Sequence, residues 1–279
     1  MENLVSFGNF IASKWLEDIN HRYPITRHPS WNRWRDICST ANAEVWYCNS
    51  LRQASDHYSW TGADAGAEFQ KLSSKLQAAV AEANDQAAHA LCLDIFKWGG
   101  VGRGASLLWL QERLASKRLC ATLQDGCDLL TELDADLCRF DGKDLLMNSA
   151  LTKVFAALAP SKLIIYDGRV GAALGLIARD YLHSIDHRGL VPEALAFRWG
   201  AARGQYVPGQ QNKRDPSDDQ FQFPALFGAH RDKLHAEMMR STSYLLSLVD
   251  GAISGGSTSN LPRLEQALFM IGYDVSRKN

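Results

Sequence analysis

The sequence lacks any apolar run of about 18 residues, the minimum length with which a helix crosses a membrane. Its first stretch, MENLVSFGNFIASKWLEDIN, places acidic side chains within an amphipathic pattern and does not resemble a signal peptide. We therefore expect a cytoplasmic protein without a membrane partner, and nothing in the sequence indicates an obligate protein partner.

Cysteine is scarce as well. The chain has 6 cysteines among 279 residues, too few for a disulfide scaffold of this size. The most closely spaced ones, Cys120, Cys127 and Cys138, include no CxxC pair, and no histidines follow the HExxH pattern of zinc hydrolases. The sequence thus predicts reduced thiols, no metal site and no other cofactor.

An excess of positive charge is also missing, because the formal net charge is −1. Proteins that bind nucleic acid over much of their surface need many basic side chains to neutralise phosphates, so this class is disfavoured. A local basic groove remains compatible with the composition, and arginines recur in HRYPITRHPSWNRWR near the N-terminus.

The patterns that are present are mostly those of helices, and we expect a mainly α fold with few or no long strands. We expect an N-terminal helical and irregular, aromatic-rich region over residues 1–75 and a helical core over 76–279. Helical patterns cover 65–97 with an interruption near Asn84, 106–119 with Ser106 as a plausible cap, 150–159, 168–185, 192–204, 229–252 and 261–274. A polar segment without regular pattern spans 205–224, and loops of this length are usually functional or disordered.

The stretch WGGVGRG, residues 98–104, contains four glycines and follows a helical pattern. It is neither a Walker loop, since no GK[ST] follows, nor a Rossmann fingerprint, since no strand precedes it. One interpretation is a glycine C-cap and turn. The other is a cradle of backbone N–H groups for a phosphate, with Arg103 nearby.

The stretch SALTKVFAALAPSKLIIYDGRVGAAL, residues 149–174, combines a short helix, a proline, an apolar segment and a capping aspartate. The helix rises about 10 Å from Lys153 to Pro160. The extended return to Asp167 spans up to about 23 Å. The return path is therefore long enough to place Asp167 beside the start of the helix, and we predict that Lys153 and Asp167 form a catalytic pair.

Such a pair suits attack on the sugar of a nucleotide. A lysine amine is a nucleophile only when it is unprotonated, which requires burial or a positive neighbour. A carboxylate stabilises positive charge that develops on the sugar ring. The product would be a Schiff base between lysine and sugar, and the departing base would first be flipped out of the stack.

The same stretch resembles the catalytic segment of helix-hairpin-helix DNA glycosylases, in particular the 8-oxoguanine DNA glycosylase branch. That branch opens its second helix with TKV and a later helix with VD-x-x-V, and this chain has LTKV at 151–154 and IYDGRV at 165–170. The close overlap covers about 25 residues, a length within the scale of one supersecondary motif. The helical plan of 80–250 is similar in outline to bacterial proteins with the 8-oxoguanine DNA glycosylase fold.

The resemblance implies roles for particular residues. Lys153 matches the nucleophilic lysine, Asp167 the aspartate that caps the next helix and assists catalysis, and Arg169 a residue that contacts backbone phosphate. The family hairpin PGVG is replaced by Asn148, Ser149 and two apolar residues, so contacts to DNA there are altered or made by side chains. The iron–sulfur cysteine pattern of some relatives is absent.

A flipped base also needs stacking and edge contacts. Trp98, Trp199, Phe221 and Phe223 are candidates because each lies beside a turn or loop, although core packing is the more frequent role of a single aromatic. Arg198 is a candidate for a phosphate contact or for a surface ion pair.

The sequence thus predicts a DNA glycosylase that acts on double-stranded DNA and leaves an abasic site, with or without strand cleavage. The resemblance implies 8-oxoguanine as the substrate; a bulky modified base of phage DNA, such as glucosylated hydroxymethylcytosine, is the other candidate and would make the protein an antiviral enzyme. Three alternatives stay open: a non-catalytic DNA-binding module on the same fold, an enzyme that binds a small nucleotide at residues 98–104, and a structural protein in which Lys153 and Asp167 form a salt bridge.

Overall fold

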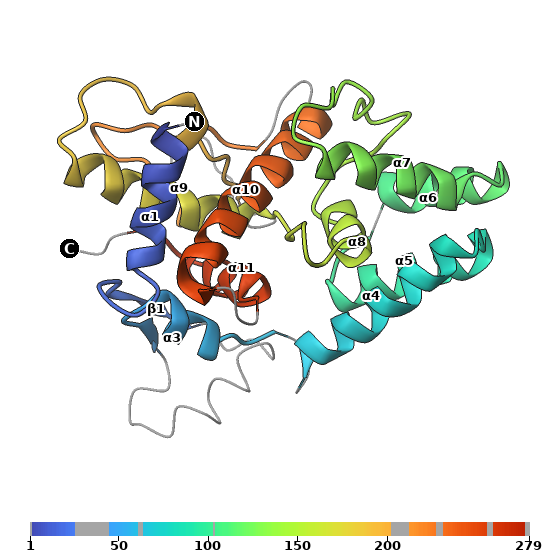
Figure 1. Cartoon of the computed structure of the whole chain (residues 1–279), viewed down its shortest axis with the longest axis horizontal. Coiled ribbons are helices and arrows are strands. Elements are labelled where there is room, and N and C mark those ends of the chain that lie inside the picture. The colour runs from blue at the N-terminus through green and yellow to red at the C-terminus, as the bar shows by residue number, and fades with distance from the viewer. Residues whose placement is uncertain are drawn as a thin grey trace. The chain divides into compact units, whose positions relative to one another are not determined.

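A computed structural model of the chain describes residues 2–25, 45–60, 64–102, 104–201, 212–226, 231–255 and 259–276. Over these ranges the protein is mainly α-helical, as predicted, and its strands are short (Figure 1). The helices are α1 (Glu2–Ser13), α3 (Leu51–Asp56), α4 (Ala65–Ala81), α5 (Asp85–Trp98), α6 (Ala105–Ala115), α7 (Leu119–Thr131), α8 (Leu151–Leu158), α9 (Gly168–Ser184), α10 (Arg231–Ser254) and α11 (Leu261–Ile271). Strands β1 (His21–Pro24) and β2 (Val45–Cys48) form an antiparallel pair, and a 3₁₀ turn, η2, covers Glu193–Leu195. None of the described helices is long and apolar enough to span a membrane.

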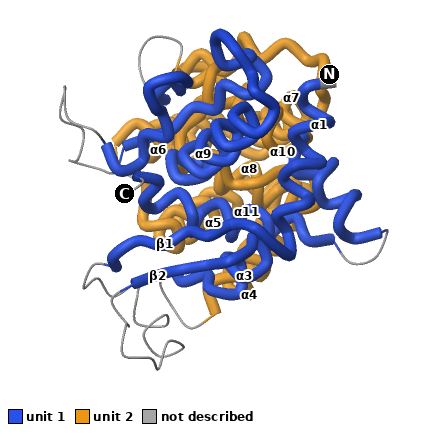
Figure 2. Tube along the Cα trace, turned by 90° about the vertical axis from the view of Figure 1, so that its left-hand side faces the viewer, with its two compact units in different colours: residues 1–61, 167–227, 245–279 blue, residues 62–166, 228–244 orange. Residues whose placement is uncertain are grey.

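The chain divides into two compact units, each built from separate stretches of sequence (Figure 2). Unit 1 comprises residues 1–61, 167–227 and 245–279, and unit 2 comprises 62–166 and 228–244. These bounds differ from the regions 1–75 and 76–279 expected from the sequence, because the chain enters unit 1 three times. The expectation that 76–279 forms a glycosylase-like core stays a prediction.

Unit 2 is organised around the short helix α8. Helices α4 and α5 form a hairpin at the break predicted near Asn84, whose side chain accepts a hydrogen bond from the Ala87 N–H at 3.0 Å and so caps α5. Helices α4, α5 and α7 all pack against α8 (Figure 1). Every residue of α8 from Leu151 to Ala157 is buried as a consequence. Lys153 lies in the middle of this buried helix.

Unit 1 packs α1 and α11 against α9, most of whose residues are buried. The β1–β2 hairpin is fixed to α11 by Tyr23, whose hydroxyl donates to the Met270 carbonyl at 2.7 Å and whose ring stacks on Trp46. Trp46 is fully buried, which is the core role that the sequence favours for a single tryptophan.

Two local predictions are wrong. Residues 192–201 do not form the helix expected over 192–204, since only the short turn η2 is regular there and Trp199 pairs with Ala225 in a β-bridge. Residues 202–204 lie outside the described residues. Leu195, Phe197 and Trp199 are buried while the residues between them are partly exposed, a period of two that extended backbone produces. Ser106 does not cap its helix, because α6 begins at Ala105 and the Ser106 hydroxyl instead accepts a hydrogen bond from Asn148.

Candidate functional site

Lys153 is buried inside unit 2, with only 6% of its surface exposed. Lysine is almost never fully buried in proteins unless it is paired or functional. Its Nζ donates a hydrogen bond of 2.8 Å to the Ser149 carbonyl and lies 3.4 Å from the Ser149 hydroxyl. Lys153 is therefore not a solvated surface lysine, and its amine is held beside the turn that precedes α8.

The glycine-rich turn that follows α5 forms a wall of this lysine site. Gly99 is the C-cap of α5, as one interpretation of the sequence has it, and its N–H donates to the Ile95 carbonyl at 2.9 Å. The Lys153 stem passes so close to Gly99 that a Cβ atom there would lie 2.5 Å from the lysine Cδ. Gly99, the first glycine of the stretch singled out in the sequence, is thus adjacent to the lysine, a contact that no sequence pattern indicates.

Asn148 and Ser149, the two residues of the turn before α8 that were predicted to contact DNA, have partners within the protein. The Asn148 side chain accepts hydrogen bonds from the N–H groups of Ala150 and Leu151 and donates to the Ser106 hydroxyl, so it closes the turn that leads into α8. Ser149 provides the carbonyl and the hydroxyl next to Nζ of Lys153. Both residues therefore position the lysine helix, while their predicted contacts to DNA stay predictions.

Asp167 is the N-cap of α9 in unit 1, as predicted. Its backbone is extended, with φ −121° and ψ 177°, and one carboxylate oxygen accepts hydrogen bonds from the N–H groups of Arg169 (2.8 Å) and Val170 (3.1 Å). The chain crosses from unit 2 to unit 1 between Tyr166 and Asp167. Lys153 and Asp167 belong to different units, and the catalytic pairing of the two stays a prediction.

Arg169 follows the capping aspartate and lies against aromatic rings of unit 1. Its guanidinium carbon is 4.3 Å from the ring centroid of Phe269, 5.1 Å from that of Tyr273 and 5.6 Å from that of Trp60. Cation–π contacts of this kind contribute about 0.5–2 kcal/mol each, depending on desolvation. The side chain is thus anchored by rings as well as being a candidate for a phosphate contact.

Two further cations, Lys213 and Arg214, belong to the same part of unit 1. The Lys213 amine is 3.9 Å from the ring centroid of Tyr273. The pKa of Arg214 is lowered to about 10, chiefly by burial and next by repulsion from Arg169, while attraction to Asp167 and Tyr273 acts in the opposite direction. The Arg214 Nε is buried without a hydrogen-bond partner among the described residues. We call Arg169, Lys213, Arg214 and Tyr273 the basic–aromatic cluster; sequence reasoning identified only Arg169, because the other members come from distant segments.

Most of the predicted base-stacking aromatics lie in the core of unit 1, and their contacts with a flipped base stay predictions. Trp199, Phe221 and Phe223 are all buried in unit 1, and the Trp199 indole N–H donates to the Phe223 carbonyl at 3.1 Å. Trp98 is half-buried in unit 2, where its ring packs on Phe69 and its N–H donates to the Ala65 carbonyl. Packing against other protein groups accounts for all of these placements, as it does for most single aromatics.

The two remaining arginine candidates for a phosphate contact are Arg198 and Arg103. Arg198 is half-buried and donates to the Ala225 carbonyl at 3.2 Å, so it ties η2 and the following segment to the chain near Ala225. Arg103 lies outside the described residues, as do residues 205–211 of the polar segment. The described part of that segment, residues 212–224, has no helix or strand, in agreement with the sequence.

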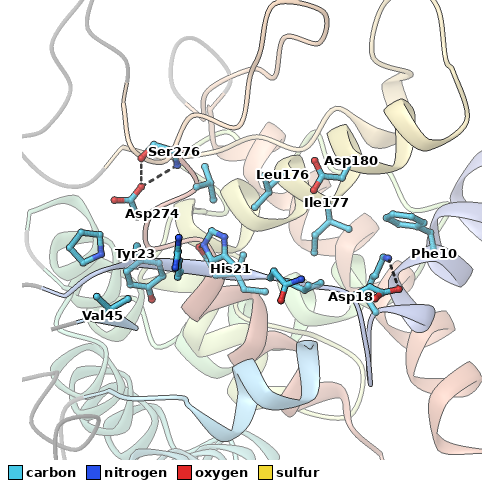
Figure 3. Close-up of a pocket in the computed structure, with 17 residues that line it drawn as sticks. Phe10, Asp18, His21, Tyr23, Val45, Leu176, Ile177, Asp180, Asp274 and Ser276 are labelled. Carbon is cyan, nitrogen blue, oxygen red and sulfur yellow. Dashed lines mark hydrogen bonds and ion pairs between the residues drawn. The ribbon is translucent and has the colours of Figure 1, made fainter. Parts of the chain in front are cut away.

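A separate pocket of about 680 Å³ lies within unit 1 (Figure 3). His21 and Tyr23 of β1 line it together with Leu176, Ile177 and Asp180 of α9. Burial lowers the pKa of His21, although the Ile271 carbonyl and the Asp274 and Asp180 carboxylates act in the opposite direction. None of the residues predicted for catalysis or DNA contact lines this pocket, so it adds no group to the lysine site.

The described residues contain no group of three or more His, Cys, Asp or Glu side chains placed to hold a metal ion. Comparison with known proteins finds no matching family model, no similar curated protein and no similar solved structure. A proposal about function therefore rests on the geometry of the lysine site and of the basic–aromatic cluster.

Proposed function

We propose that the protein is a DNA glycosylase that acts in the cytoplasm, with Lys153 as the nucleophile and Asp167 as an assisting carboxylate. The observation that carries this proposal is the burial of Lys153, whose amine donates a hydrogen bond to the Ser149 carbonyl. Burial disfavours the charged form of an amine, and only the neutral form attacks carbon. The non-catalytic alternative predicts an exposed lysine, so the burial favours the enzyme.

The reaction follows from these groups. The lone pair of the Lys153 amine forms a bond to the anomeric carbon of the nucleotide while the bond from that carbon to the base breaks. The base leaves with the electron pair and takes up a proton, and the attached amine loses one. The ring oxygen then leaves the same carbon and is protonated, while the nitrogen lone pair forms the double bond of an iminium ion. Asp167 would stabilise the positive charge that develops on the sugar during the first step.

The basic–aromatic cluster supports nucleic acid as the substrate. Arg169 and Lys213 lie against the ring of Tyr273, and Arg214 interacts electrostatically with Arg169 and Tyr273. The whole chain carries a net charge of −1, so positive charge is concentrated locally. Surfaces that bind nucleic acid combine cations for the backbone with aromatic faces for bases. Its members Arg169 and Arg214 are also electrostatically coupled to each other and lie in the same unit as Asp167.

Two substrates are proposed, 8-oxoguanine in a repair enzyme and a bulky base such as glucosylated hydroxymethylcytosine in a phage-defence enzyme. Excision of the bulky base would leave abasic sites that block replication of the invading DNA. The hairpin that departs from PGVG and the absence of an overall basic surface favour a specialised role. Both substrates use the same lysine chemistry, so one assay distinguishes them.

The test is borohydride trapping on duplexes that carry 8-oxoguanine, uracil, hydroxymethylcytosine or glucosylated hydroxymethylcytosine. Hydride from the reagent converts the iminium ion into a stable secondary amine that links protein to DNA. We expect a covalent band on one modified duplex, lost in Lys153→Gln and kept in Lys162→Gln, which replaces an exposed lysine. Absence of both trapping and base release on every duplex would refute the proposal and favour a DNA-binding module.

A further inference from the structure

The backbone of Gly99 does not require glycine. Its φ of −78° and ψ of −4° lie in a region that every L-residue adopts, whereas the neighbouring Gly100 has a φ of +62°. An alanine at the C-cap of α5 would therefore be unstrained in its own backbone. The reason for glycine at position 99 has to lie in what surrounds the missing side chain.

The space that a side chain would fill is taken by Lys153. A Cβ atom on Gly99 would lie 2.5 Å from the lysine Cδ and 2.6 Å from Cε, while the next contact, Val101 Cγ2, is at 3.3 Å. The two closest atoms are the last carbons before the amine. Gly99 thus touches the part of Lys153 that sets the position of Nζ.

Neither Gly99 nor Lys153 can move away from the other without disturbing a hydrogen bond. The Gly99 N–H is bonded to the Ile95 carbonyl, which fixes the turn to the end of α5. Helix α8 is buried along its length, so Lys153 moves chiefly by rotation about its side-chain bonds. An ordinary contact of 3.4 Å in place of 2.5 Å requires the stem to move by about 1 Å. That movement is transmitted to the amine and to its hydrogen bond with Ser149.

We propose that Gly99 is a positioning residue for the Lys153 amine, and that the glycine-rich turn serves the lysine rather than a phosphate. The proposal rests on the proposed glycosylase function for its catalytic meaning. Misplacing a reacting group by about 1 Å costs on the order of 100-fold in rate. We therefore expect Gly99→Ala to slow single-turnover base excision on the order of 100-fold while the Kd for the DNA duplex stays unchanged.

Two matched glycine variants serve as controls. Gly251→Ala adds a methyl group in α10 where no atom lies within 4 Å and should leave excision unchanged. Gly126→Ala places its Cβ 2.7 Å from the ring of Phe155, which also belongs to α8 but not to the lysine site. Gly126→Ala should lower the Tm, but it should not slow base excision as Gly99→Ala does. Equal excision rates for Gly99→Ala and wild type, or an equal loss in Gly126→Ala, would overturn the proposal.

A second measurement is independent of catalysis. Reductive methylation with ¹³C-formaldehyde gives Lys153 an NMR resonance, which is assigned by its absence in Lys153→Gln. Gly99→Ala should shift this resonance and its pH titration, and Gly251→Ala should leave both unchanged; an unshifted resonance would overturn the proposal. If wild-type protein excises no base, the proposed function fails while the resonance still tests the contact.

Should Gly99→Ala fail to fold, the clash can be relieved from the other side. Lys153→Ala removes the two carbons that the new Cβ would meet, so the double variant Gly99→Ala, Lys153→Ala should fold and unfold at the Tm of Lys153→Ala alone. A double variant that also fails to fold would show that the damage has another origin and would overturn the proposal.

Discussion

The structural role and the chemical role of a single residue can be tested separately at Asp167, whose side chain caps α9 and is proposed to assist catalysis. Its capping oxygen accepts two backbone hydrogen bonds, from Arg169 and Val170. An asparagine offers an oxygen at the same place and is as good an N-cap as aspartate, whereas alanine offers none. Asp167→Asn therefore removes the charge alone, whereas Asp167→Ala removes both the charge and the cap.

The expected losses in stability follow from these contacts. Asp167→Ala should lose about 0.5–2 kcal/mol for the missing cap. Asp167→Asn should lose about 0.3–1 kcal/mol from the interaction of the charge with the helix dipole. The asparagine also loses the attraction between Asp167 and Arg214, so the pKa of Arg214 should fall further below its usual value. At roughly 2–4 °C per kcal/mol for a chain of this size, the Tm of Asp167→Asn should fall by only a few degrees.

The loss of activity should be far larger. A positioned acid–base or electrostatic group contributes on the order of 10²–10⁴ in rate, and asparagine cannot carry the charge. We expect single-turnover base excision by Asp167→Asn to fall within that range while its Tm stays near that of wild type. Thermal unfolding followed by circular dichroism and quenched-flow base release measure the two quantities on the same preparation.

Two results would refute this reasoning. If Asp167→Asn unfolds as readily as Asp167→Ala, capping by the carboxylate charge dominates and the catalytic role loses its support. If Asp167→Asn is well folded and excises the base at the wild-type rate, Asp167 is only a helix cap. Lys153→Gln in parallel reports whether any excision remains without the nucleophile.

The remaining predictions concern histidine and cysteine side chains. Burial lowers the pKa of His21 below its unfolded value, so the contribution of His21 to stability is present above about pH 6.5 and is lost as pH falls through the folded pKa. The Tm of wild type should therefore fall more steeply from pH 7 to pH 5 than the Tm of His21→Gln, and parallel curves of Tm against pH would contradict this. In a Cys38→Ser background, Ellman's reagent at pH 8 should rapidly label Cys138, which is exposed, whereas burial raises the pKa of Cys48 to about 12 and that of Cys127 to about 11. A fast phase that survives Cys138→Ser would show that one of the buried thiols is accessible.

Local sequence patterns were sufficient for most helices. The break near Asn84, the stop after α8 before Pro160 and the cap at Asp167 each depend on residues a few positions apart, and each is present in the structure. The pattern failed at residues 192–201, the described part of the helix expected over 192–204, where alanine and leucine favour a helix. There the burial of Phe197 and Trp199 in the core of unit 1 outweighed a preference worth a few tenths of a kcal/mol per residue.

The sequence alone identified the residues that we propose to carry the chemistry: a lysine inside an apolar helix and an aspartate at the start of another. Only the tertiary structure decided their surroundings. Gly99 meets Lys153 across 54 positions of sequence, and Arg214 and Tyr273 join Arg169 from two other segments. Contacts of this kind leave no periodicity or spacing in the sequence, because they arise when separate helices pack and the atoms of one occupy the space that another leaves empty.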